Sequence, residues 1–335
     1  MRVRAEIINV TLRHPFQLAR GPADTTRETV IVHLGDALGE ATPIRYAGET
    51  AAAVRDALDG LKVADDVTLD TLGDVLDAFA AQHPQLRSAW AGLDFALHDL
   101  VGRRMGRPIY QMLDLDPVLA PATSFTLAMA APDLLRRKVE EAAPYAIFKV
   151  KLGSPADWDT LALIRSRTDK PIRVDANEGW TVEQALAMTQ RLPEFGVELV
   201  EQPVQRDDLD GLAAVTAASP LPVIADESCQ HYADLDQLAG RVHGINIKLM
   251  KCGGLRQGLR MVRRASELGL RVMLGCMIET SIGITAAAHL SPLVDWADLD
   301  GHLLISDDPF VGVTLDPTGR LVLPAEAGLG VKVRA

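Results

Sequence analysis

The sequence predicts an α/β protein built on a closed parallel (β/α) barrel that follows a mixed α and β segment. After Pro121, short apolar strands alternate with helical stretches, and the strands lie near residues 122–127, 146–152, 171–175, 197–201, 222–226, 244–249, 271–276 and 299–304. Their starts are roughly 22–28 residues apart, the length of one strand-plus-helix unit. Strands repeating in this way favour a barrel. An open doubly wound sheet is the alternative, but no glycine-rich phosphate fingerprint follows the first strand.

The segment before the barrel has a different pattern of strand-like and helical residues. Residues 3–12 and 28–34 read as strands, and a turn is predicted from Gly35 to Gly39. From about Thr50 to Leu113 the pattern is helical. The tail, residues 314–335, is strand-like again, and we expect it to fold back onto the N-terminal part. A chain of 335 residues exceeds the usual size of one domain, which favours two domains or one with an appendage.

Composition excludes several classes of protein. The formal net charge of −11 argues against a nucleic-acid partner. Three scattered cysteines fit neither a disulfide framework nor a zinc site, so we expect reduced thiols and a cytoplasmic protein. The N-terminus has no apolar stretch typical of a signal peptide, and no run is long enough to span a bilayer, so no membrane partner is expected.

Two lysines end the second barrel strand, where catalytic residues of such barrels lie. Alternation puts Lys149 and Lys151 on the face that points into the barrel, opposite Phe148 and Val150. A solvated strand edge is the alternative, but a closed barrel has no edge. Two neighbouring ammonium groups repel each other, and this predicts a depressed pKa for at least one of them. A neutral lysine can act as a base near neutral pH.

Carboxylates end the next three strands. Asp175, Glu201 and Asp226 each follow apolar residues. Taken singly, each has an ordinary explanation as a helix N-cap or a surface charge. Together, on consecutive strands, they would repel strongly, and a hard divalent cation such as Mg²⁺ resolves that repulsion.

The sixth strand adds a lysine on the far side of the barrel. Alternation directs Lys248 inward, whereas Lys251 is expected in the loop that follows. Because the sixth strand faces the second, Lys151 and Lys248 would approach a central ligand from opposite sides.

These motifs, Lys-Val-Lys, Asp-Ala-Asn, Glu-Gln-Pro, Asp-Glu-Ser and Lys-Leu-Met-Lys-Cys-Gly-Gly, resemble the enolase superfamily and, within it, the muconate-lactonizing subgroup. The resemblance covers essentially the whole chain. It implies an N-terminal α+β capping domain over residues 1–118, with the tail 314–335 packing on it, and a modified (β/α)7β TIM-like barrel over residues 119–313.

The resemblance also implies roles for individual residues. Asp175, Glu201 and Asp226 match ligands of one Mg²⁺ per active site, and Lys151 and Lys248 match the two acid/base groups. Supporting positions are matched by Lys149, which tunes Lys151, and by Asn177 and Glu227. The chemistry agrees, because Mg²⁺ stabilises the enediolate formed when a proton α to a carboxylate is removed. A lysine base acting beside Mg²⁺ is a pattern of this superfamily.

Within the subgroup, one pair of acids resembles dipeptide epimerases of the L-Ala-D/L-Glu type, which act on a fragment of peptidoglycan. Asp298 and Asp300 are two residues apart and would project the same way from a strand. Two acids on one face suit the free α-ammonium group of a dipeptide. An acidic surface loop is the alternative explanation.

Loops should complete the substrate site. Arg20 is a candidate for pairing with a glutamyl carboxylate, or else a solvated arginine. The loop around Arg45 and Tyr46 departs from the epimerase pattern because Ala47 is interposed. Met277 and Ile278, after the seventh strand, are expected to line the substrate.

Other functions remain open. N-acylamino-acid racemases, o-succinylbenzoate synthases and lactonizing cycloisomerases of the same subgroup act on substrates without a free ammonium. A Schiff-base lysine, as in barrel aldolases, or a non-enzymatic binding protein would use the scaffold differently. The preferred dipeptide and the oligomeric state, including a homo-oligomer, are not defined by the sequence.

Overall fold

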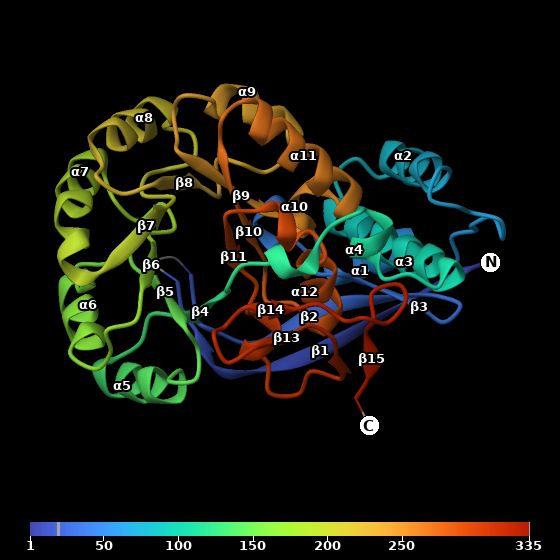
Figure 1. The fold of residues 1–335 in the computed structure, drawn as a ribbon, viewed down its shortest axis with the longest axis horizontal. Helices are drawn as coiled ribbons and strands as arrows, with labels where there is room; N and C mark the ends of the chain where they lie inside the picture. Colours follow the sequence, from blue (N-terminus) through green and yellow to red (C-terminus); the bar gives the residue numbers. More distant parts are fainter. Residues whose placement is uncertain (19–20, 335) are drawn as a thin grey trace.

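The computed structural model describes residues 1–18 and 21–334. Its N-terminal part is a three-stranded antiparallel sheet, β1-β2-β3, covered by helices (Figure 1). The strands and helices of this part are β1 (Val3–Phe16), β2 (Asp24–Leu34), β3 (Ala37–Ala41), the 3₁₀ helix η1 (Arg45–Ala47), α1 (Ala51–Leu58), α2 (Leu72–Gln82), α3 (Arg87–Met105) and α4 (Ile109–Met112). Both predicted strands and the helical pattern are confirmed.

Close packing of β3 on α3 shapes this part. A Cβ at Gly39 would collide with the carbonyl oxygen of Gly92, so the strand and the helix meet through two glycines. The predicted turn is longer than the one that forms. Gly35, at φ +63°, turns the chain together with Asp36, and Gly39 already belongs to β3.

Eight parallel strands in sequential order, β4 to β11, form the barrel (Figure 1). They are β4 (Ser124–Leu127), β5 (Ile147–Lys151), β6 (Ile172–Asp175), β7 (Val197–Glu201), β8 (Val223–Ala225), β9 (Gly244–Lys248), β10 (Arg271–Gly275) and β11 (Trp296–Asp298). A parallel bridge between Thr123 and Ala297 joins the two edges, so the sheet nearly closes on itself. The predicted barrel is confirmed.

Helices and short 3₁₀ turns surround the strands. They are η2 (Pro117–Leu119), α5 (Pro132–Glu141), α6 (Asp157–Arg165), α7 (Val182–Arg191), η3 (Leu192–Phe195), α8 (Leu209–Ala218), η4 (Tyr232–Asp234), α9 (Leu235–Leu238), α10 (Leu249–Cys252), α11 (Leu255–Glu267), α12 (Ser281–Ala288), η5 (Ser291–Leu293) and η6 (Gly301–Leu304). Val150, Val174 and Val200 are fully buried in the core beneath the helices. In the described part of the chain, no helix is long and apolar enough to cross a membrane.

The eighth strand lies earlier than the sequence predicts. β11 covers Trp296–Asp298, whereas residues 301–304, expected to be strand, form the 3₁₀ helix η6. The apolar pair Leu303-Leu304 mimics a strand pattern, but the chain has already left the sheet at Asp300, whose φ of −109° and ψ of 1° are not extended.

The C-terminal tail makes two small antiparallel pairs and contacts the N-terminal helices. β12 (Phe310–Val311) pairs with β15 (Lys332–Val333), and β13 (Thr314–Leu315) pairs with β14 (Leu321–Val322). The amide of Leu329 donates to Asp99 Oδ1 at 2.7 Å, and the amide of Ile109 donates to the Gly328 carbonyl at 3.0 Å. The domain limits themselves stay a prediction.

Candidate active site

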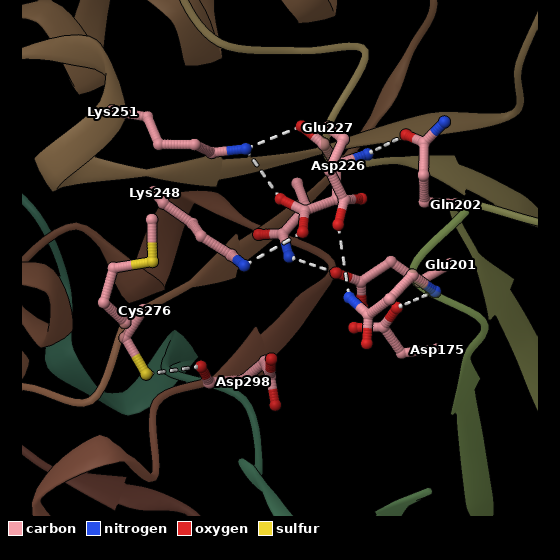
Figure 2. Close-up of polar contacts among 12 residues, drawn as sticks. Asp175, Glu201, Gln202, Asp226, Glu227, Lys248, Lys251, Cys276 and Asp298 are labelled. Carbon is pink, nitrogen blue, oxygen red and sulfur yellow. Dashed lines mark hydrogen bonds and ion pairs between the residues drawn. The ribbon is translucent and has the colours of Figure 1, made fainter. Parts of the chain in front are cut away.

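Three buried carboxylates meet at the C-terminal end of the barrel. Asp175 and Glu201 are the last residues of β6 and β7 and are register partners, and Asp226 directly follows β8. Each is at most 3% exposed. One carboxylate oxygen from each lies within 4.8 Å of the others, and Figure 2 shows the three side chains converging. The parallel strands therefore bring the three predicted metal ligands together.

Lys149 is buried among these acids. Its Nζ lies 2.6 Å from Glu201 Oε2, 2.6 Å from Asp298 Oδ2 and 3.1 Å from Asp175 Oδ2. Burial alone would lower the pKa of Lys149, but the charges of Asp298, Glu201 and Asp175 outweigh it and raise that pKa well above its ordinary value. The depressed pKa predicted for at least one of the two lysines is thus not found at Lys149, because three carboxylates are its close partners.

Lys151 and Lys248 reach the acids from opposite strands. Lys151, at the end of β5, donates from Nζ to Asp175 Oδ2 at 2.6 Å. Lys248, at the end of β9, donates to Asp226 Oδ2 at 2.9 Å. In the barrel order β5 and β9 are separated by three strands on either path, so the two ammonium groups face each other across the acids.

Lys251 does not lie in a loop, so the prediction for this residue is wrong. It lies in the short helix α10, is 2% exposed, and donates to Asp226 Oδ1 at 2.6 Å (Figure 2). Its Nζ also donates to the carbonyl oxygens of Asp226 at 2.6 Å and Cys229 at 3.0 Å. All three ammonium protons are therefore used in holding one carboxylate and the backbone beside it.

The sequence contains a signal for Lys251 that strand alternation misses. It stands three residues after Lys248, and buried Leu249 and Met250 separate the two lysines. Gly253 and Gly254, both at positive φ, allow one helical turn to end directly after Cys252. The strand end at Lys248 and the single helical turn that follows it bring both lysines to the same acid, Asp226.

The acids differ in their affinity for protons. Burial, then the charge of Asp175, raises the pKa of Glu201 to about 8. Burial also opposes ionisation of Asp175, but Lys151 and Lys149 lower its pKa to about 2. Ion pairs with two lysines lower the pKa of Asp175, whereas Glu201 pairs with Lys149 and lies beside the negative charge of Asp175.

This donor set fits a hard divalent cation. It consists of carboxylate oxygens from three buried acids that lie within 4.8 Å of each other. A bound cation would add positive charge that offsets the repulsion among the three buried carboxylates.

Two further predicted residues, Asn177 and Glu227, lie beside the three acids. Asn177 donates from Nδ2 to Glu227 Oε1 at 3.2 Å, and its backbone amide donates to Asp175 Oδ1 at 2.9 Å. Burial, then the charges of Asp226 and Asp175, raises the pKa of Glu227 to about 7. The sequence does not predict a role for Asn246, and its Nδ2 donates to Glu201 Oε1 at 2.8 Å.

Asp298 and Asp300 are both buried, but they do not share a strand face. Asp298 ends β11 and pairs with Lys149, while its Oδ1 accepts from Ser124 Oγ at 2.7 Å. Asp300 lies beyond the strand and accepts from the Thr126 amide at 2.6 Å. Burial, then the charge of Asp298, raises the pKa of Asp300 to about 6. The geometric argument of a common strand face is therefore wrong, although both carboxylates lie at this end of the barrel.

The residues predicted to complete the substrate site from the loops lie in different surroundings. Arg20 lies outside the described residues. Tyr46 donates from its hydroxyl to Gln230 Oε1 at 3.2 Å, so the loop bearing Ala47 reaches the barrel.

Ile278, after β10, is buried in an apolar cluster with Val10, Leu12 and Ile305. The amide of Met277 donates to Glu279 Oε1 at 2.7 Å. Cys276 donates from Sγ to the Asp298 carbonyl, consistent with packing (Figure 2).

Comparison with known proteins agrees with this architecture. The family model for the mandelate racemase / muconate lactonizing enzyme N-terminal domain matches residues 2–114, and the model for enolase C-terminal domain-like proteins matches residues 131–335. A curated relative, the L-Ala-D/L-Glu epimerase of Bacteroides thetaiotaomicron, is 44% identical over 325 residues, which cover 96% of this chain and 85% of that protein.

Solved structures match over nearly the whole chain as well. The substrate-liganded L-Ala-D/L-Glu epimerase of Bacillus subtilis is 31% identical with a TM-score of 0.87, covering 100% of this chain and 99% of that one. The dipeptide epimerase of Enterococcus faecalis, in complex with Mg and L-Leu-L-Tyr, is 32% identical with a TM-score of 0.86, covering 98% of each chain. The chain therefore belongs to the mandelate racemase / muconate lactonizing enzyme family of the enolase superfamily.

Proposed function

We propose that this protein is a Mg²⁺-dependent isomerase that inverts the α-carbon of the C-terminal residue of a dipeptide such as L-Ala-D/L-Glu. The observation that carries the proposal is the pair Lys151 and Lys248, on opposite strands of the barrel with three buried carboxylates between them. The names of the related epimerases support the dipeptide as substrate.

The two lysines exchange protons with opposite faces of the α-carbon. One lysine, as a neutral amine, takes the α-proton and becomes an ammonium, while the other, as an ammonium, gives a proton to the opposite face. The total charge of the two lysines is unchanged, and the configuration is inverted. Asp175, Glu201 and Asp226 would hold one Mg²⁺, which would supply positive charge to stabilise the negative charge that develops on the substrate carboxylate.

Lys149 and the Asp pair have separate tasks in this proposal. Lys149, held by Asp298, Glu201 and Asp175, stays an ammonium and supplies positive charge beside the acids without exchanging a proton. The dipeptide ammonium group is bound by Asp298 and Asp300.

Deuterium exchange in D₂O tests the proposal. The protein is incubated with Mg²⁺ and a library of dipeptides, and each is followed by mass and by circular dichroism. We expect one deuteron at the α-carbon of the C-terminal residue together with loss of optical activity at that centre. If no dipeptide gains mass, the proposed function is wrong.

A second candidate function is an N-acylamino-acid racemase, and one observation favours it. Lys149 already neutralises Asp298, which leaves less net negative charge for a substrate ammonium. Replacing both Asp298 and Asp300 with Asn separates the candidates, since it should abolish dipeptide turnover and spare turnover of N-acylated amino acids.

A further inference from the structure

A buried glutamate of the N-terminal domain holds a loop of the barrel. Glu40, in β3, is fully buried, and β3 packs against α12 (Figure 1). Its Oε1 accepts from the Thr280 amide at 2.9 Å, and its Oε2 accepts from Thr280 Oγ1 at 2.6 Å and from the Gly283 amide at 2.9 Å. These donors belong to the first turn of α12 and the residue that precedes it, so a carboxylate from another part of the chain caps this helix.

Two threonines, Thr29 in β2 and Thr42 directly after β3, complete the binding of this carboxylate. Thr29 Oγ1 donates to Glu40 Oε1 at 3.0 Å, and Thr42 Oγ1 donates to the same oxygen at 3.2 Å. Within residues 1–18 and 21–334, no lysine, arginine or histidine forms an ion pair with Glu40. Burial raises the pKa of Glu40, and hydrogen bonds from Thr280, Gly283 and Thr29 oppose that rise.

The arrangement requires a carboxylate rather than an amide. Each oxygen of Glu40 accepts from a backbone N–H, of Thr280 or of Gly283, and a backbone N–H cannot reverse its role. A glutamine in either orientation would turn its NH₂ group toward one of these N–H groups. Gly283 also has no room for a side chain, because a Cβ there would collide with Glu279 Oε2.

The segment that Glu40 anchors begins at the barrel mouth. Met277 and Glu279 precede Thr280 by one to three residues, and the Met277 amide is tied to the Glu279 carboxylate. Directly after β3, the Thr42 amide donates to Met250 Sδ at 3.4 Å, and Met250 is two residues from Lys248. The same short stretch of the N-terminal domain thus contacts the chain after β10 and the chain after β9.

We infer that Glu40 is a positioning residue that fixes the loop between β10 and α12, and thereby the wall of the substrate site. The assignment of this loop to the substrate rests on the proposed function. Within the described residues no hydrogen bond or ion pair joins Glu40 to Asp175, Glu201 or Asp226, so we expect it to affect substrate binding rather than the metal ligands.

The test is Glu40→Gln, studied by hydrogen–deuterium exchange mass spectrometry, Mg²⁺ titration calorimetry and steady-state kinetics with L-Ala-L-Glu. We expect faster amide exchange in peptides covering residues 277–284, with unchanged exchange in peptides from β6 and β8 and an unchanged Mg²⁺ affinity. KM should rise roughly tenfold or more, with a smaller change in kcat, because misplacing a substrate wall weakens binding. Glu6→Gln, the same change on an exposed residue of β1, should leave all these quantities unchanged.

Two results would overturn the inference. One is normal exchange over residues 277–284 in Glu40→Gln, and the other is exchange that rises equally throughout the barrel, which would make Glu40 a general stabiliser. If Glu40→Gln does not fold, Glu40→Asp, which keeps the charge and shortens the side chain, must show the same local increase or the inference fails. Absence of turnover by the wild-type protein would count against the proposed function alone, since the exchange measurement needs no substrate.

Discussion

Replacing Lys251 with Met should weaken both the fold and the metal site. The substitution keeps the length of the side chain but removes an ammonium group that is 2% exposed and donates to Asp226 Oδ1 and to the carbonyls of Asp226 and Cys229. Removing one partner of a buried ion pair costs about 3–5 kcal/mol when the remaining charge is left unpaired; because Asp226 keeps Lys248 as a partner, the cost here should be about 3 kcal/mol. We expect the free energy of unfolding to fall by about that amount.

The effect on metal binding should be separate and measurable. Losing a partner that orients a metal ligand lowers affinity about 10- to 100-fold, so calorimetry should give a Mg²⁺ Kd raised by that factor. Lys248→Met is the matched control, because Lys248 makes a single hydrogen bond to the other oxygen of Asp226. It should abolish turnover with a smaller loss of stability in urea. Unfolding and Mg²⁺ binding of Lys251→Met that match the wild-type protein would refute this reasoning.

Three further predictions concern pH, substrate binding and the metal. His289 donates from Nε2 to the Leu329 carbonyl and accepts from the Tyr110 amide, and burial lowers its pKa to about 4. Because the pKa of an unfolded histidine is about 6.5, the stability that neutral His289 contributes is complete above that pH and is lost as pH falls toward 4. The free energy of unfolding should therefore fall by about 2 kcal/mol between pH 7 and 5 on account of this residue. In urea unfolding, His289→Gln should lack this pH-dependent loss, and a pH dependence equal to that of the wild-type protein would contradict the prediction. Asp300→Asn should raise KM for L-Ala-L-Glu about 10- to 100-fold by removing one charge-assisted hydrogen bond, and an unchanged KM would exclude Asp300 from the ammonium site. Mg²⁺ at 100 times its Kd should stabilise the fold by about 2.7 kcal/mol, and equal unfolding curves in Mg²⁺ and in EDTA would argue against a metal at the three carboxylates.

Strand alternation is sufficient to predict the centre of the site. Lys151, Asp175 and Glu201 each end a parallel strand, and residues in register at the same end of a barrel must meet. Their spacing along the chain repeats with the strand-plus-helix unit, so the prediction needs no knowledge of side-chain contacts.

Alternation fails where the chain leaves the sheet. Asp300 and Lys251 stand beyond the last strand residue, directly before a 3₁₀ helix and in a short helix, where a period of two no longer applies. Pairwise repulsion between Lys149 and Lys151 is also a poor guide, because the sequence does not reveal that Asp298, far away in the chain, supplies a counter-charge. The role of Glu40 is hidden for the same reason, since its partners are 240 and 243 residues away.

The central claim is that Lys151 and Lys248 act on opposite faces of one carbon. It is tested by α-proton exchange in D₂O with Lys151→Ala and Lys248→Ala, each offered L-Ala-L-Glu and L-Ala-D-Glu separately with Mg²⁺. We predict that neither variant inverts the centre and that each still exchanges the α-proton of a single diastereomer, the two variants choosing opposite ones. A variant that still epimerises, or two variants that exchange the same diastereomer, would contradict the account.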